Sequence, residues 1–298
     1  MKNYRYGLAS AGLALLIIAG AFSGLIPSYF IYGISLIYAY GAANLEKPAY
    51  LIPSFIIMCF IALIAYGPSL GLLEIILLAI HGLVLGISFH RRQTPEMIFF
   101  PSLAVLFATM LLVLFLQYRL TGINGLEQIM DGYISQMKTQ SFDPETIKIV
   151  REVITQYGLS IIFIVALSIN LLVVWLFNKI LGIRGLRRTG RFTFEFFRLR
   201  GLGLLQLVQL YAITALGSYL SDMPMEVALV TLSLILISLF FIQGLSLLVY
   251  SIKSRSKGRF RLYFLVGLSF FMPPVQFILA FMGLLDQVKD FRKLEKIG

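Results

Sequence analysis

Long apolar stretches separated by short polar segments dominate this chain of 298 residues. A helix needs about 20 mostly apolar residues to cross the ~30 Å hydrocarbon core of a bilayer. By this measure the pattern predicts an all-α, polytopic transmembrane helix bundle of about nine spans, within a range of eight to ten, forming a single integral membrane domain over residues 1–298. The expected spans are approximately 6–25, 28–43, 50–66, 69–89, 97–117, 158–181, 202–221, 226–250 and 262–285.

Prolines interrupt some of these stretches. The second and third spans are short, and they are bordered or entered by Pro27, Pro48, Pro53 and Pro68. One of the two could be a re-entrant segment, because non-helical backbone at membrane depth needs protein or water around it. The pair Pro273-Pro274 lies inside the ninth span, and we expect it to break or kink that helix.

Residues 119–157 form the one long segment outside the expected spans, and we expect it on the extracytoplasmic side. Asn124 can cap a helix with apolar positions three and four residues apart, and Asp143-Pro144-Glu145 is typical of a second helix start. The segment therefore predicts a hairpin of two amphipathic helices, either paired or lying along the membrane. This hairpin could be a simple lid on the bundle, or a gate or partner-docking element.

The composition supports a membrane location. Hydrophobic residues make up 59% of the chain and charged residues 13%, about half of the ~25% that is usual in soluble domains. A soluble globule with so few charges could not cover its own surface. The one cysteine, Cys59, lies in an apolar run, so a disulfide framework and a thiolate metal site are excluded.

The 25 Lys and Arg residues are distributed unevenly between the loops. A cytoplasmic N-terminus places 17 of them on the cytoplasmic side, which is the asymmetry of the positive-inside rule. We therefore expect a multi-pass protein of the inner or plasma membrane with its N-terminus in the cytoplasm. Nine spans place the tail after Asp286 outside, although it carries four cations, so an even number of spans with a cytoplasmic tail stays open.

Two clusters of cations lie in the expected cytoplasmic loops. The loop at 182–201 alternates Arg with Phe between Arg184 and Arg200, and Lys253–Arg261 is a second cluster. A cation near an anionic leaflet gains about 1 kcal/mol. We therefore expect both clusters to contact anionic lipid, and we do not expect loops embedded at a membrane surface to bind nucleic acid.

Ionisable groups inside the bilayer are the clearest functional signals, because a charge at the centre of a helix costs roughly 2.5–3.5 kcal/mol or more. Glu74 and His81 lie seven residues apart in the fourth span, so two turns place them on one face. With Asn170 of the sixth span they are the candidate ligand-binding residues, for a cationic or hydrogen-bonding solute or for a proton relay. The alternative is that they form hydrogen bonds between helices.

Small residues in the first span predict close helix packing. Gly7 and Ala11, and likewise Gly20 and Gly24, lie four residues apart, which lets a neighbouring backbone approach. This face could contact another helix or a membrane-protein partner.

No motif typical of an enzyme occurs in the sequence. It has no GxxxxGK[ST] loop and no HExxH motif, and its only histidines are His81 and His90. We therefore predict that the protein is not an enzyme, uses no metal or cofactor, and does not supply its own ATPase.

Three stretches resemble the YybS-like family of bacterial multi-spanning membrane proteins, a domain of unknown function. They are NKILGIRGLRRTGRF from Asn178, FEFFRLRGLGLLQL from Phe194 and MGLLDQVKDFRK from Met282. The most specific part is the ending, with Asp286, Asp290, Phe291 and Arg292. The resemblance covers most of the chain, and Gly201 departs from the Pro of many members.

The resemblance implies a bacterial inner-membrane protein but no established activity. The general layout is similar to that of the membrane-embedded substrate-binding components of vitamin-type transporters, which need a separate ATPase. Our leading hypothesis is therefore a small-solute-binding transport component that relies on a separate energising partner. The alternative is a non-transport scaffold or assembly factor for an envelope or cell-division complex.

Overall fold

The computed structural model describes residues 2–23, 25, 28–45, 51–67, 69–122, 124–140, 142–183, 192–200, 202–221, 224–255, 259–289 and 291–292. These residues are almost entirely helical, and no β-strand occurs among them. The helices are α1 (Lys2–Phe22), η1 (Ser28–Tyr32), α2 (Gly33–Asn44), α3 (Ile52–Tyr66), α4 (Leu70–His90), α5 (Pro95–Thr121), α6 (Gly125–Thr139), α7 (Pro144–Ile183), η3 (Phe194–Phe196), α8 (Leu204–Leu220), α9 (Met225–Arg255), α10 (Arg259–Phe271) and α11 (Pro273–Lys289).

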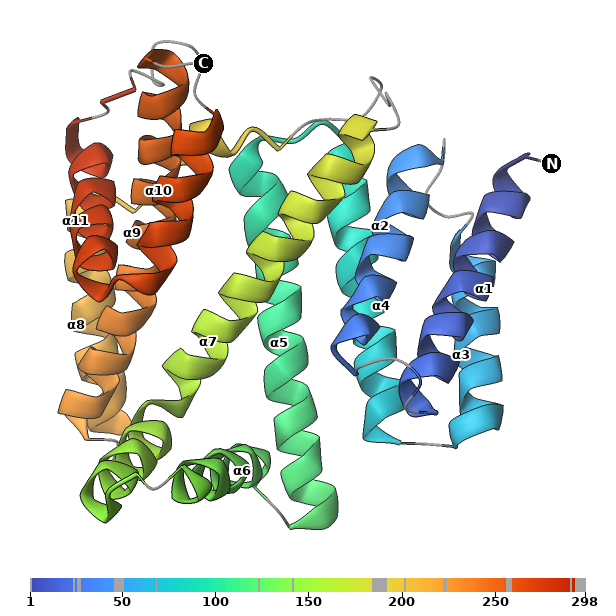
Figure 1. The fold of residues 1–298 in the computed structure, drawn as a ribbon, viewed down its shortest axis with the longest axis horizontal. Helices are drawn as coiled ribbons and strands as arrows, with labels where there is room; N and C mark the ends of the chain where they lie inside the picture. Colours follow the sequence, from blue (N-terminus) through green and yellow to red (C-terminus); the bar gives the residue numbers. More distant parts are fainter. Residues whose placement is uncertain are drawn as a thin grey trace. The chain divides into compact units, whose positions relative to one another are not determined.

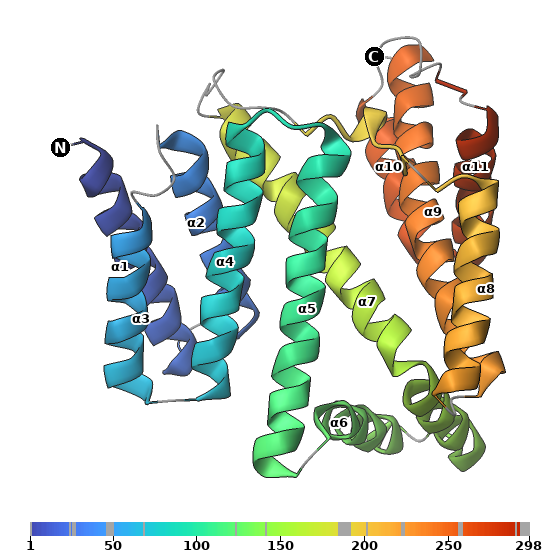
Figure 2. The ribbon, with the colours of Figure 1, turned by 180° about the vertical axis from the view of Figure 1, so that it is seen from behind.

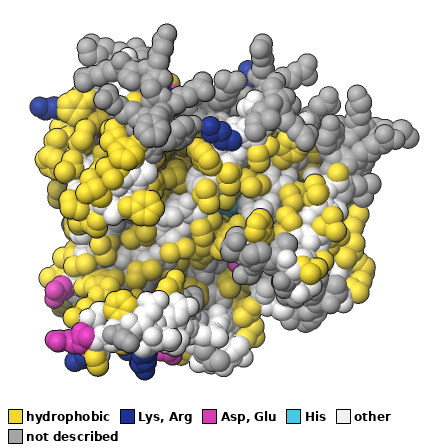
Figure 3. Space-filling model, viewed as in Figure 1, with side chains coloured by type: hydrophobic (Ala, Val, Ile, Leu, Met, Phe, Trp, Pro, Cys, Tyr) yellow, Lys and Arg dark blue, Asp and Glu magenta, His cyan; other side chains and the backbone are white. Residues whose placement is uncertain are grey.

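The chain forms two compact units, each described here by itself. Unit 1 consists of Met1–Arg151 and Val165–Phe192, and unit 2 consists of Glu152–Ile164 and Thr193–Gly298. In unit 1, α2 lies beside α4 and α1 lies beside α3, while in unit 2, α8 and α11 lie beside α9 (Figure 1, Figure 2). Hydrophobic side chains dominate the surface seen in Figure 3, as expected for helices surrounded by lipid. That the two units act as a single integral membrane domain stays a prediction.

Local capping signals explain where α4 and α5 of unit 1 begin. The Ser69 hydroxyl accepts a hydrogen bond from the Leu72 amide at 3.2 Å and starts α4. The Thr94 hydroxyl accepts one from the Met97 amide at 3.5 Å, and Pro95 occupies the first position of α5. Side-chain caps of this kind satisfy amide groups that have no partner within the helix.

The structure does not confirm the expected nine membrane crossings. Four described helices, α4, α5, α7 and α9, are long and apolar enough to span a membrane, and the bent pair α10–α11 is a fifth if it counts as one span. The expected span at 28–43 is divided into η1 and the 12-residue α2, which at 1.5 Å per residue covers only ~18 Å. The apolar parts of α1, α3 and α8 are also short.

Glycines allow two helix pairs to pack with their backbones nearly touching. A Cβ atom at Gly82 of α4 would overlap the carbonyl oxygen of Ser35 in α2, and one at Gly244 of α9 would overlap that of Leu279 in α11. Gly283 faces Phe240 across the same seam of unit 2. Such small-residue seams bring helices together in lipid, where burial of apolar surface provides no driving force.

The expected break at Pro273-Pro274 is confirmed. α10 and α11 meet at Met272 with a bend of 108°, because proline cannot donate the amide hydrogen bond that would continue α10. The bend turns the chain back within unit 2 toward the end at which α9 stops. There Lys253 of α9 pairs with the Glu195 side chain at 2.9 Å, and Arg292 donates to the Glu195 carbonyl at 2.9 Å.

This return of the chain bears on the position of the C-terminal tail, which the sequence left open. A straight ninth span would separate the tail from Lys253, whereas the structure places Arg292 and Lys253 at the same end of unit 2. The sequence-based count of nine assumed that every apolar run of sufficient length crosses the membrane, and the structure does not confirm that count. A run that is bent in its middle does not have to cross.

Helices begin at both positions predicted for the amphipathic pair, as α6 and the first part of α7. Asn124 accepts from the Leu126 amide at 3.1 Å, and Asp143 accepts from the Glu145 amide at 2.9 Å. Tyr157, with non-helical angles, marks the kink at which this part of α7 meets the apolar span. In unit 1, α6 lies across the end of α5 (Figure 1).

Hydrogen bonds also set the charge state of the Asp143 cap. The Glu145 amide donates to this carboxylate and, with Thr146, holds the pKa of Asp143 below its ordinary value. Because the folded-state pKa is lowered, the stabilisation by the cap is present at neutral pH and is lost as the pH falls through that lowered pKa.

The position of the C-terminus can be tested by thiol labelling in intact cells and in inverted vesicles. In a Cys59→Ser background, we expect Lys253→Cys and Lys289→Cys to react from one side and Lys138→Cys from the other, because α7 is one span between residues 138 and 192. Labelling of Lys289→Cys from the same side as Lys138→Cys would show that α10–α11 crosses the membrane.

Substitution of the seam glycines should destabilise the fold. Gly82→Ala and Gly244→Ala insert a Cβ into backbone of the neighbouring helix, and overpacking of this kind costs roughly 1–3 kcal/mol. Gly12→Ala and Gly267→Ala are matched controls, since a Cβ at either position meets nothing within 4 Å. Thermal unfolding in detergent, followed by circular dichroism, should show lower Tm for the first pair alone; equal Tm values for all four variants would contradict the seams.

Candidate functional site

Three helices of unit 1 bring polar groups together around His81. The His81 side chain in α4 is fully buried, and its Nε2 lies 3.0 Å from Oδ1 of Asn170 in α7. Nδ2 of Asn170 donates to the carbonyl oxygen of Phe99 in α5 at 3.2 Å. We call His81, Asn170 and the Phe99 carbonyl the His81 network. It joins two of the three residues that the sequence suggested as ligand-binding.

The Phe99 carbonyl determines the chemical form of His81. A carbonyl accepts only, so the amide nitrogen of Asn170 must face Phe99 and the amide oxygen must face His81. Nε2 of His81 therefore carries the hydrogen, and in the neutral ring Nδ1 is an acceptor. Nδ1 is buried and has no hydrogen-bond partner among the described residues.

The backbone of α5 is altered beside the His81 network. Pro101 lies inside α5 and removes one amide donor from the helix. Ser102, fully buried, turns its hydroxyl back to the carbonyl oxygens of Ile98 at 3.0 Å and Phe99 at 2.9 Å. Ser hydroxyls that bond backward in this way often accompany helix bending, so the network lies at a locally modified part of a spanning helix.

Glu74 does not join the His81 network. It lies on α4 seven positions before His81, which at 1.5 Å per residue is about 10 Å along the helix. Glu74 is partly buried, and no hydrogen bond or ion pair of its side chain is described. A shared role with His81 stays a prediction.

The small residues of α1 fall in different environments. Ala11 is 3% exposed and packs in the core of unit 1 with Tyr38, Met58 and Ile75. Gly20 is partly buried, the surroundings of Gly7 are not described, and Gly24 lies outside the described residues. In the described structure the neighbours of Ala11 therefore belong to its own chain, and docking of a partner on this face stays a prediction.

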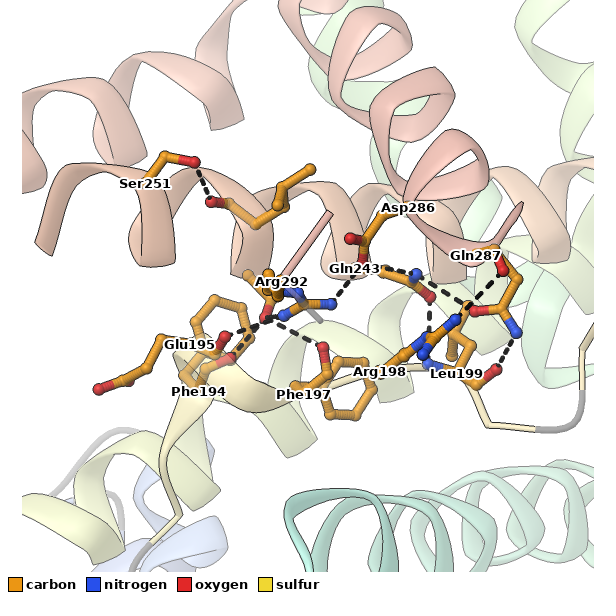
Figure 4. Close-up of polar contacts among 12 residues, drawn as sticks. Phe194, Glu195, Phe197, Arg198, Leu199, Gln243, Ser251, Asp286, Gln287 and Arg292 are labelled. Atoms are coloured by element: carbon orange, nitrogen blue, oxygen red, sulfur yellow. Dashed lines mark hydrogen bonds and ion pairs between the residues drawn. The ribbon is translucent and has the colours of Figure 1, made fainter. Parts of the chain in front are cut away.

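A second polar cluster in unit 2 holds residues 194–199, which consist of the short 3-10 helix η3 and the irregular backbone that follows it. Polar side chains of α9, of α11 and of the residues just after it point at the main chain of residues 194–199 (Figure 4). We call this arrangement the C-terminal clamp. Its side chains are Gln243, Ser246, Asp286, Gln287 and Arg292.

The side chains of the clamp form hydrogen bonds with backbone groups of residues 194–199 that an α-helix would have paired internally. Gln243 Oε1 accepts from the Leu199 amide at 3.1 Å, and Gln287 Nε2 donates to the Leu199 carbonyl at 2.7 Å. The Ser246 hydroxyl lies within hydrogen-bond distance of the carbonyls of Phe194, at 2.6 Å, and Phe197, at 3.0 Å. Side chains thus satisfy backbone groups that would otherwise be buried without partners.

A buried ion pair lies at the centre of the clamp. Arg292 Nη2 donates to Oδ2 of Asp286, and both side chains are 0% exposed. Gln243 Nε2 donates to the same carboxylate oxygen at 3.1 Å. Arg292 Nη1 also donates to the Glu195 carbonyl at 2.9 Å and to the Ser246 hydroxyl at 2.8 Å. The guanidinium therefore joins α9, the end of the chain and the 194–199 segment.

Only an indirect signal of the clamp is present in the sequence. Asp286 and Arg292 belong to the ending that carries the family resemblance, but their partners lie about 40 to 97 positions away along the chain. Polar residues at both ends of an apolar run are the signal that could have identified them.

The basic loops are described in part. Residues 184–191 and 256–258 lie outside the described residues. Arg198 is 7% exposed and donates to the Gln287 carbonyl at 3.2 Å, so this cation belongs to the clamp and not to an exposed lipid contact.

Together, the long apolar helices and the buried polar networks define a polytopic helical membrane protein. Residues 11–287 match the model of a family described as a predicted membrane protein (DUF2232). The chain belongs to this family, as the resemblance indicated. No curated protein and no solved structure matches it. Within the described part of the chain, no group of three or more His, Cys, Asp or Glu side chains could hold a metal ion.

Breaking the buried ion pair should cost far more than breaking an exposed one. Asp286→Asn leaves the Arg292 charge buried and uncompensated, for which we expect a loss of about 3–5 kcal/mol in the free energy of unfolding. Asp131→Asn removes the carboxylate that pairs with Arg151 at 2.8 Å on the exposed hairpin, and exposed pairs are worth at most about 1 kcal/mol.

Unfolding of both variants in mixed micelles measures this difference. The double variant Asp286→Leu/Arg292→Met should recover part of the stability lost in Asp286→Asn, because two apolar side chains leave no buried charge. Equal losses for Asp286→Asn and Asp131→Asn would show that the clamp is open to water.

Proposed function

We propose that the chain is a membrane-embedded component of a transport system for a small polar solute, with the His81 network as its recognition site. The unpartnered Nδ1 of His81 is the observation that carries this proposal. A buried polar atom without a partner costs free energy, and polar groups kept at membrane depth commonly belong to substrate or ion pathways. A bound solute that donates a hydrogen bond to Nδ1 would remove this cost.

The chemistry of the site limits the class of solute. Nδ1 is an acceptor, so its partner has to be a donor such as a hydroxyl, an amine or an amide N–H. Asn170 donates one amide hydrogen to the Phe99 carbonyl, and its Oδ1 accepts from His81, so these two bonds orient the His81 ring. Small hydroxylated or amine-bearing solutes therefore suit the site better than carboxylates or phosphates.

A separate partner would supply the energy for transport. The sequence has no phosphate-binding loop of the ATPase type. We further propose the bacterial inner membrane with a cytoplasmic N-terminus. The return of the chain at Met272 supports this orientation, since it moves the four cations of the tail to the side that already holds 17 of 25.

Exposed apolar side chains on the α6–α7 hairpin favour a second candidate function, a scaffold for an envelope or cell-division complex. Tyr133 is 61% exposed, and Ile149 is also exposed. Such a role would depend on residues 124–157 and not on His81, so deletion of the hairpin and substitution of His81 separate the two candidates.

A thermal-shift screen of the purified protein tests the transport proposal. We expect one or more small polyols or amines to raise the Tm of the wild-type protein in detergent. His81→Phe should abolish that rise, because it removes the acceptor atom. His90→Phe is the matched control on the same helix, since His90 bonds the Ala43 carbonyl at 3.2 Å, outside the His81 network.

The proposal is wrong if no polyol or amine shifts the wild-type Tm, or if His81→Phe responds to the solute as the wild type does. Asn170→Leu gives a further check, because it frees Nε2 while leaving the ring in place. We expect it to weaken the solute response but not to abolish it.

A further inference from the structure

The C-terminal clamp gathers three segments at one end of unit 2. Arg292 fixes the end of the chain to the Glu195 carbonyl and to Ser246 of α9. The Lys253 ammonium pairs with the Glu195 carboxylate at 2.9 Å. Residues 194–200, the end of α9 and the end of α11 therefore form one continuous surface, although they are separated by up to 97 positions in the sequence.

Cations are exposed on this surface. Arg200 and Lys289 are exposed, and the Lys253 side chain is 50% exposed. Glu195 is the acid that the described structure places among them, and its side chain is 19% exposed. Three exposed cations against one acid give the described part of this surface a net positive charge.

Exposed apolar side chains accompany the cations. Phe196 is 40% exposed and lies edge-on to Tyr250 of α9, with ring centroids 6.2 Å apart. Phe291, beside Arg292, is 52% exposed, and Val288, beside Lys289, is 61% exposed. Aromatic and apolar groups next to cations, at the end of a spanning helix, suit the interface between hydrocarbon and headgroups.

We propose that this end of unit 2 binds anionic phospholipid headgroups, with Arg200, Lys253 and Lys289 as the contacting cations. The surface complements a lipid better than a nucleic acid or an acidic peptide, because Phe196, Val288 and Phe291 continue from the cations onto the apolar helices. Arg198 and Arg292 take no part in this contact, since their guanidinium groups are buried in the clamp. The proposal does not depend on the solute site at His81.

Lipid retention by the purified protein tests the proposal. The protein is extracted in detergent and offered equal amounts of phosphatidylglycerol and phosphatidylcholine, and the bound lipids are counted by native mass spectrometry. We expect the wild type to retain phosphatidylglycerol preferentially. The triple variant Arg200→Gln/Lys253→Gln/Lys289→Gln should lower that preference by roughly fivefold for each contacting cation at low salt.

The outer hairpin provides a matched control. Lys138→Gln/Lys148→Gln/Arg151→Gln also removes three exposed cations, one of them from an ion pair with an acid, and it should leave the preference unchanged. Two results would overturn the proposal. In the first, the wild type shows no preference, or the two triple variants lose it equally. In the second, the surface variant keeps its lipid but loses co-purified RNA or an acidic protein, which would assign the surface to that partner.

Discussion

The absence of water from the hydrocarbon core is the constraint on which the rest of this structure depends. Every buried amide, carbonyl and charge has to find its partner within the protein. α-Helices meet this requirement by themselves. Residues 194–199 of unit 2 lie outside the α-helices, and five polar side chains converge beside them. The clamp supplies hydrogen bonds that an α-helix would have made within its own backbone.

The same constraint accounts for how the helices pack. In lipid, apolar side chains gain nothing by leaving their surroundings, so contacts between helices depend on close approach and on hydrogen bonds. Gly82 and Gly244 allow the approach. Ser35, which donates to the Leu78 carbonyl at 2.8 Å, adds a bond across the α2–α4 seam. The short helix α2 can therefore stay buried although it cannot span a bilayer.

Local patterns predicted much of the fold and little of the sites. Apolar runs located the long helices, Asn124 and Asp143 marked the starts of α6 and α7, and Pro273 marked the break, because each depends on neighbours in the sequence. The pairing of His81 with Asn170, 89 positions apart, could not be predicted, since periodicity assigns a residue to a helix face but not to a partner. The side of the tail stayed open at the sequence level because the number of apolar runs does not reveal a turn inside one of them.

The two polar networks differ in what their side chains are needed for. In the clamp, Gln243, Ser246 and Gln287 bond the main chain of residues that have no helical partners, so a structural need explains them. In the His81 network, α4, α5 and α7 are helical and supply most of their own backbone hydrogen bonds. No backbone group requires His81: its described partner is the Asn170 side chain, and its Nδ1 has no hydrogen-bond partner among the described residues. A polar residue kept at membrane depth with no backbone group to satisfy is typical of a ligand site, and this supports the proposed solute site at His81 over the clamp.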